Sequence, residues 1–103
     1  MSDVIGIHLV CRDGRGVTKN PDGTFSTRAW KVRRRHAETA LYVALHQSRY
    51  SLSYLQGRVV SAHQDPREPH RLVIVFESDD MPRRWEGKAT GEKGYLRRRV
   101  GTS

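Results

Sequence analysis

Arginine has the clearest chemical potential in this sequence, because it is concentrated in three tight clusters at residues 33–35, 83–84 and 97–99. A guanidinium group stays ionised at physiological pH and binds phosphate oxygens through forked, charge-assisted hydrogen bonds. Such runs suit the recognition of a phosphodiester backbone, and a solvated charged face is the alternative for each of them. The candidate phosphate-binding residues are Arg28, Lys31, Arg33, Arg34, Arg35, Arg83, Arg84, Arg97, Arg98 and Arg99.

Aromatic side chains lie beside these cations. Trp30 is next to Lys31, Trp85 follows the second arginine cluster, and Tyr95 precedes the third. Basic grooves with interleaved rings hold unpaired bases by stacking. Tryptophan is also a common core residue, and for Trp30, in a strand-like segment, the sequence favours packing in the core. For Trp85, between charges, it favours a surface or pocket position.

The histidines suggest a different chemistry. The His-x-Glu pattern at residues 36–38 is typical of zinc deaminases, but that chemistry needs two further thiolate ligands and the chain has one cysteine. We expect His8 to be a core residue and His46 to lie near a helix C-terminus. Small basic ribonucleases, however, combine histidine acid–base groups with arginines that stabilise phosphate. The histidines available for that alternative are His36, His46, His63 and His70.

Neither the cysteine nor the glycine-rich segment completes a catalytic motif. Cys11 in an apolar strand is best interpreted as a buried small side chain. Residues 87–94 depart from the phosphate-loop pattern, since Glu92 stands where the second glycine belongs. We therefore predict no catalytic residue, no metal and no cofactor, and a binding protein is favoured over an enzyme.

Composition indicates the class of partner. The 103 residues carry a formal net charge of +8 and a pI near 10.4. A field of this sign attracts polyanions, so nucleic acid, DNA or RNA, is the expected partner; an acidic protein surface is the further alternative. The length predicts a single domain over residues 1–103. One cysteine, no basic leader and no bilayer-length apolar run predict a cytoplasmic protein without a membrane partner.

Several elements must position these side chains. The apolar run 4–11 predicts a buried strand, and the turn sequence at residues 20–23 predicts a short hairpin. Between residues 34 and 47 the apolar residues recur at helical spacing, which predicts the main amphipathic helix. Three arginines at its start oppose the helix dipole, an arrangement that a bound phosphate would relieve.

The second half of the chain predicts more strands. Residues 54–62 and 71–77 read as an antiparallel pair joined by a proline-stiffened loop, with the second strand central in its sheet. After Ser78 we expect a long loop, followed by a basic segment 96–103 that is either a strand end or a tail. The predicted fold class is α+β: a small mixed or antiparallel curved sheet with one main helix at about 34–47.

One stretch of the sequence resembles a known family. Trp30-Lys31-Val32-Arg33, the run ending in His46-Gln47-Ser48, and Gly57-Arg58-Val59-Val60 leading to Asp65-Pro66 are similar to the EVE branch of PUA-like domains over about 40 residues. That family has a strand where the periodicity here indicates a helix. The resemblance implies a small curved sheet or barrel with helices at its rim and an aromatic-lined pocket that accepts a base, often a modified one, extruded from DNA or RNA. Trp30 and Ser48 would then lie near that pocket, with residues 33–35 on phosphates.

Overall fold

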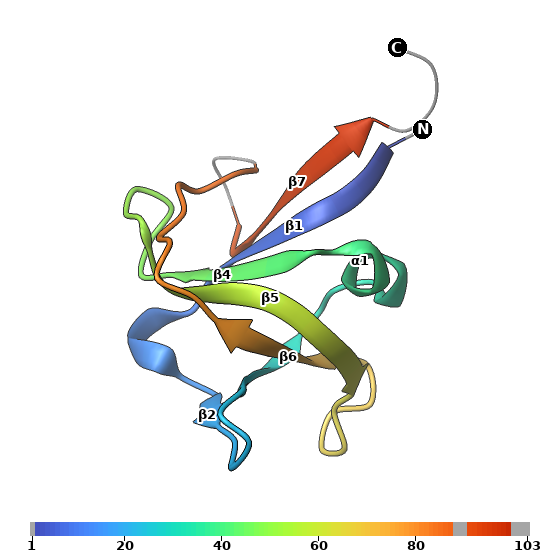
Figure 1. The fold of residues 1–103 in the computed structure, drawn as a ribbon. Coiled ribbons are helices and arrows are strands. Elements are labelled where there is room, and N and C mark those ends of the chain that lie inside the picture. The colour runs from blue at the N-terminus through green and yellow to red at the C-terminus, as the bar shows by residue number, and fades with distance from the viewer. Residues whose placement is uncertain (1, 88–90, 100–103) are drawn as a thin grey trace.

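Seven strands form a single mixed sheet in the order β2-β3-β6-β5-β4-β1-β7 (Figure 1). The computed structural model describes residues 2–87 and 91–99, with side chains for residues 3–87 and 91–98. β1 and β4 are parallel, whereas the other neighbouring strands are antiparallel. The strands are β1 (Ser2–Val10), β2 (Val17–Lys19), β3 (Phe25–Trp30), β4 (Tyr42–His46), β5 (Ser53–Gln64), β6 (Leu72–Ser78) and β7 (Lys93–Arg99). The helical segments are the 3₁₀ turn η1 (Arg12–Gly14) and the helix α1 (Arg34–Thr39).

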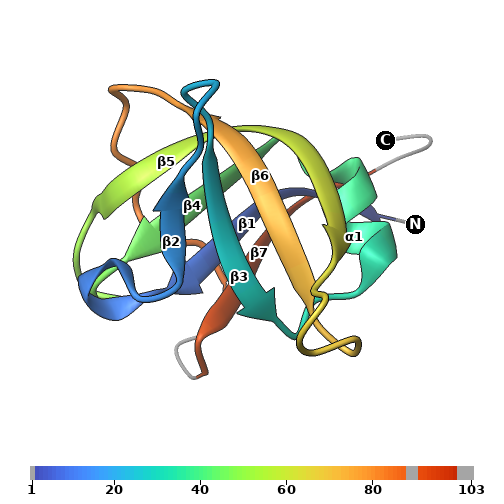
Figure 2. The same ribbon diagram turned by 90° about the horizontal axis from the view of Figure 1, so that it is seen from below.

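The sheet curls strongly, so that its inner face encloses the hydrophobic core (Figure 2). Ile7 and Leu9 from β1, Leu45 from β4, and Ile74 and Phe76 from β6 are fully buried together in this core. β2 and β7 are the two edges of the sheet and do not pair with each other. Lys93 at the start of β7 donates to the carbonyl of Lys31, in the segment that leads from β3 into α1, and we call the region between this segment and β7 the seam.

The predicted main helix at 34–47 is wrong. α1 ends at Thr39, where Ala40 adopts an extended conformation, and residues 42–46 form the strand β4. Among the described residues there is no longer helix, so the fold is nearly all β rather than α+β. Leu41, which the helical spacing assigned to the core, is 59% exposed.

Burial on both faces explains why the helical pattern was misleading. All five residues of β4 are buried. Val43 and Leu45 point into the core, while Tyr42, Ala44 and His46 lie on the outer face under another segment of the chain. A strand covered on both sides loses the apolar–polar alternation that identifies a strand, and a short apolar run then fits a helical period by coincidence.

Other predicted elements are confirmed. Asn20 and Thr24 close the hairpin between β2 and β3, with Gly23 at φ +93° in the turn. β5 and β6 form the expected antiparallel pair, and β6 is central, between β3 and β5. The sequence 96–99 belongs to β7, whereas residues 100–103 lie outside the described residues. Within the described part of the chain, no helix has the length and apolar character to cross a membrane.

Candidate functional site

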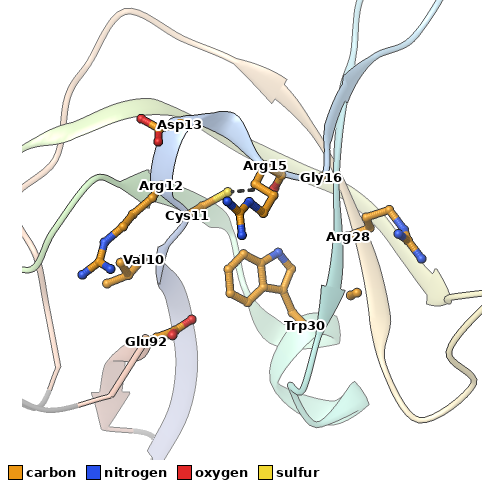
Figure 3. Close-up of a pocket in the computed structure, with 10 residues that line it drawn as sticks. Val10, Cys11, Arg12, Asp13, Arg15, Gly16, Arg28, Trp30 and Glu92 are labelled. Atoms are coloured by element: carbon orange, nitrogen blue, oxygen red, sulfur yellow. Dashed lines mark hydrogen bonds between the residues drawn. The ribbon is translucent and has the colours of Figure 1, made fainter.

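A pocket of about 480 Å³ opens at one end of the seam, which we call the mouth pocket (Figure 3). Its walls come from the end of β1, the η1 turn, β3 and the residue that precedes β7. Figure 3 shows Trp30 on one side of the opening, with Arg15 beside the indole, and Arg12 and Glu92 on the other side. The lining residues are Val10, Cys11, Arg12, Asp13, Arg15, Gly16, Arg28, Ala29, Trp30 and Glu92. An aromatic wall next to cationic side chains suits a planar ligand that carries negative charge.

The Trp30 indole is held in place by an irregularity in β3. The pairing of β3 with β6 shifts between Thr27 and Trp30, and Ala29 within this bulge has φ +68°. The indole Nε1–H donates to the Oγ1 atom of the buried Thr27 at 2.8 Å. Because its polar atom is satisfied and one side packs on the core, the ring can offer its half-exposed surface to the pocket.

The η1 turn holds Arg12 and Arg15 at the rim. Asp13, Gly14 and Gly16 all have positive φ, which places the turn in the backbone region where glycine is favoured. The Asp13 N–H donates to the Gln47 side chain at 2.9 Å, and the Cys11 N–H donates to the His46 carbonyl at 2.8 Å. These bonds tie the turn to β4 and the loop that follows it.

A second concentration of positive charge, the basic cluster, surrounds His36 farther along the seam. It comprises Arg33, Arg35, Lys93 and Arg97. Burial, followed by the nearby charges of these four residues, lowers the pKa of His36. Tyr95 packs edge-on against the His36 ring with a centroid distance of 4.7 Å. Among the described residues no ion pair neutralises any of the four cations.

The mouth pocket and the basic cluster are adjacent. Lys93 immediately follows Glu92, and its Nζ atom donates to the carbonyl oxygen of Lys31, the neighbour of Trp30, at 2.6 Å. Lys93, Tyr95 and Arg97 share one face of β7 because alternate strand residues point the same way. The two features therefore form one surface along the seam.

Arg28 belongs to the pocket wall but is already neutralised. Its guanidinium forms two hydrogen bonds with the buried Asp65 carboxylate, at 2.9 and 3.0 Å, and Figure 3 shows it pointing away from the indole. The hydrogen bonds from Arg28 hold the pKa of Asp65 below its usual value. This ion pair joins β3 to the β5–β6 loop. Arg28 therefore stabilises the fold, and its charge is already neutralised by Asp65.

The outer face of β1 and β4 carries a buried polar network. The His8 Nδ1 and His46 Nε2 atoms are 2.9 Å apart, and the His8 Nε2 atom is 2.8 Å from the Tyr42 hydroxyl. Residues 79–87, which we call the strap, leave β6 and cover this network on the way to β7 (Figure 1). From the strap, Trp85 packs edge-on against both imidazoles and Arg83 stacks on the Tyr42 ring at 3.7 Å.

The hydrogen-bond partners fix the protonation of both histidines. The His46 Nδ1 atom is 2.9 Å from the Ser51 carbonyl oxygen, which can only accept, so this nitrogen carries the proton. The His46 Nε2 atom then accepts from His8 Nδ1–H, and His8 Nε2 accepts from the Tyr42 hydroxyl. Burial, followed by the charges of His46 and Arg83, lowers the pKa of His8 to about 4, and burial also lowers the pKa of His46, so both rings are neutral at pH 7.

The predicted stacking residues do not gather in one place. Among the described residues that line the mouth pocket, Trp30 is the one that the sequence had marked for stacking. Trp85 lies over the histidine pair, and Tyr95 lies beside His36. Ser48 is in the β4–β5 loop, where its hydroxyl accepts from the Tyr50 N–H at 3.2 Å.

The predicted phosphate-binding residues do not all lie together. Arg33, Arg35 and Arg97 belong to the basic cluster, and Lys31 is exposed next to it. Arg34 lines a separate hollow with Glu38 and β5 residues. Arg83 and Arg84 lie in the strap, and Arg98 is paired in register with Asp3. The side chain of Arg99 lies outside the described residues.

The histidines of the ribonuclease alternative are also dispersed. His46 is fully buried beneath the strap, and His36 is in α1. His63 lies near the end of β5 and His70 in the loop that follows it, both exposed. No pair of these four is in contact among the described residues, which leaves the arrangement without a paired acid and base.

Sequence reasoning missed four residues of this surface: Arg12, Arg15, Glu92 and Lys93. Arg12 and Arg15 flank Gly14 directly after the first buried strand, and loops that follow buried strands are common positions for binding residues. That pattern was available in the sequence. Glu92 and Lys93 carried no such signal, because their role depends on β7 returning alongside β1.

Comparisons of the chain with protein-family models, with curated proteins and with solved structures find no match in any of the three.

Proposed function

We propose that this protein binds nucleic acid, with the phosphodiester backbone along the basic cluster and one base in the mouth pocket. The observation that carries the proposal is the convergence of Arg33, Arg35, Lys93 and Arg97 around His36 without neutralising ion pairs among the described residues. Placing like charges together costs free energy, which a bound polyanion recovers. The adjacent pocket supports a nucleic acid over other polyanions, because the Trp30 ring can stack on a base.

The single free cysteine, which is buried, supports a cytoplasmic location as part of the same proposal. The resemblance to EVE-type domains stays a prediction.

A salt titration tests the proposal. For a short single-stranded oligonucleotide, the logarithm of the binding constant should fall linearly with the logarithm of salt concentration, by about 0.7 per phosphate neutralised. Charge reversal of Arg97 or Arg33 to Glu should weaken binding about tenfold or more at about 50 mM salt and flatten the slope by about 1. Fluorescence anisotropy measures both quantities.

The matched control is Arg67→Glu, which makes the same charge change in the exposed β5–β6 loop. It should leave affinity and slope close to the wild-type values. Equal weakening by Arg67→Glu and Arg97→Glu would mean that net charge alone drives binding. No binding of any DNA or RNA strand at low salt would reject the proposed function, and an acidic protein partner would then be the candidate to test.

A further inference from the structure

Glu92 places a carboxylate in a pocket whose other charged lining residues are Asp13 and three arginines, Arg12, Arg15 and Arg28. The remaining acidic lining residue, Asp13, points away from the indole, whereas Glu92 borders the opening across from Trp30 (Figure 3). Among the described residues no ion pair neutralises Glu92. A carboxylate repels phosphate, so its position at this rim suits a different part of a bound nucleotide.

The backbone on both sides of this carboxylate is fixed. The Glu92 carbonyl oxygen accepts from the Val10 N–H at 2.9 Å, and the carbonyl of the preceding residue, Gly91, accepts from the Arg49 guanidinium at 2.8 Å. On the facing wall, the hydrogen bond from Trp30 to Thr27 fixes the indole. The indole and the backbone that carries Glu92 are therefore held in place before any ligand arrives, which reduces the ordering cost of binding.

We propose that the mouth pocket selects guanine, which stacks on Trp30 and donates its N1–H and N2–H groups to the two carboxylate oxygens of Glu92. This inference rests on the proposed nucleic-acid binding. Guanine presents two adjacent donors on one edge, which match the two acceptor oxygens of a carboxylate. Adenine and cytosine place a ring-nitrogen lone pair next to their amino group, and uracil and thymine have one N–H between two carbonyls. Each of these four bases would place a hydrogen-bond acceptor against a carboxylate oxygen, where the two would repel.

The remaining polar groups of the pocket fit the same base. The O6 atom of guanine lies beside N1 and accepts hydrogen bonds, and arginine is the usual donor to that atom. Arg15 stands beside the indole, so its guanidinium is the one placed to reach O6 of a stacked guanine, and Arg12 lies at the rim on the side of Glu92 (Figure 3). Glu92 is thus the residue that determines base specificity, while the arginines add affinity.

The test uses short oligothymidine strands in which one central base is guanine, adenine, cytosine or hypoxanthine. The guanine strand should bind about tenfold more tightly than the adenine or cytosine strand. Hypoxanthine keeps the N1–H and lacks the N2 amino group, so its strand should have intermediate affinity. In Glu92→Gln the preference for guanine should disappear, while the all-thymine strand binds at least as tightly as it does to the wild type.

Glu86→Gln is the matched control, because it removes the same charge from an exposed position in the strap and should leave the guanine preference unchanged. Equal affinity for the four strands, or a guanine preference that survives Glu92→Gln, would overturn the guanine assignment. Salt-dependent binding of the all-thymine strand would in that case leave the proposed function standing. If no strand binds, both proposals are wrong.

Discussion

His8 and His46 make the folded protein sensitive to acid. Both imidazoles are fully buried and neutral, and each uses both ring nitrogens in the network that runs from Tyr42 to the Ser51 carbonyl. A proton added to His46 Nε2 would face the His8 Nδ1–H, and a proton added to either ring would place a positive charge in a buried site. Burial is the main cause of the lowered pKa of His8, and the charges of His46 and of Arg83, which is stacked over Tyr42, add to it.

The free energy of unfolding should therefore fall as the pH is lowered from about 6.5 to about 4. The folded-state pKa of His8 lies at about 4, below its value of 6.5 in the unfolded chain, so the unfolded state binds more protons in this interval. The full stabilisation is present above pH 6.5, and about 3 kcal/mol is lost on reaching pH 4. Urea unfolding at several pH values measures this loss.

A control variant, His63→Gln, changes an exposed histidine, and its free energy of unfolding should depend on pH as that of the wild type does. In His8→Gln the dependence should shrink, even though the variant is less stable at neutral pH. Stability that stays constant between pH 6.5 and 4.5 in the wild type would contradict neutral buried histidines.

We expect His36 to cause a second pH dependence, which affects the binding of nucleic acid rather than folding. Burial and the charges of Arg33, Arg35, Lys93 and Arg97 lower its pKa in the free protein. A phosphate bound among these cations offsets their charge and raises the pKa again, so binding takes up a proton. Affinity for an oligonucleotide should increase as the pH falls from about 7.5 to about 6. In His36→Gln this increase should be absent; an unchanged increase would remove His36 from the interface.

At the scale of elements, substitutions at two positions distinguish the observed α1 and β4 from the predicted helix at 34–47 by their effect on the free energy of unfolding. On a helix spanning 34–47, Leu41 would lie on the apolar face and Val43 would not. In the structure Leu41 is 59% exposed and Val43 is fully buried. Val43→Ala should therefore cost about 2 kcal/mol of unfolding free energy, and Leu41→Ser less than about 0.5 kcal/mol. The reverse order, measured by urea unfolding, would support the helix.

The same elements explain how far the sequence could predict the fold. The β2–β3 hairpin and the β5–β6 pair depend on local turn residues and on contacts between neighbouring segments, so their patterns could be read directly. β4 depends on residues far from it in the chain: β1 lies beside it, and the strap covers His46. Since that cover is invisible in the local sequence, the buried run fits the spacing of a helix as well as that of a strand.

The candidate site was predictable to a similar degree. The clustering of arginine in the sequence predicts Arg33, Arg35 and Arg97 as phosphate-binding residues, whereas the local pattern favours core packing for Trp30 and the resemblance to EVE-type domains implies its pocket position. What could not be predicted is which cations stay unpaired, because the neutralisation of Arg28 depends on the distant Asp65. The place of Glu92 across from Trp30 likewise follows from the pairing of β7 with β1.

At the scale of the whole molecule, the incomplete closure of the sheet creates the proposed interface. β2 and β7 are both edges, and the seam beside β7 carries the mouth pocket at one end and the basic cluster at the other. The exposed β5–β6 loop is joined instead to β3 through Asp65. Because the mouth pocket and the basic cluster both lie along the seam, binding should be confined to that side of the fold.

Backbone amide chemical shifts, followed by NMR during titration with a short oligonucleotide, test this claim most directly. We expect shift changes within residues 11–16, 28–36 and 92–97, and unchanged shifts within residues 58–70. Changes centred on 58–70, or spread evenly over the chain, would contradict an interface formed by the seam.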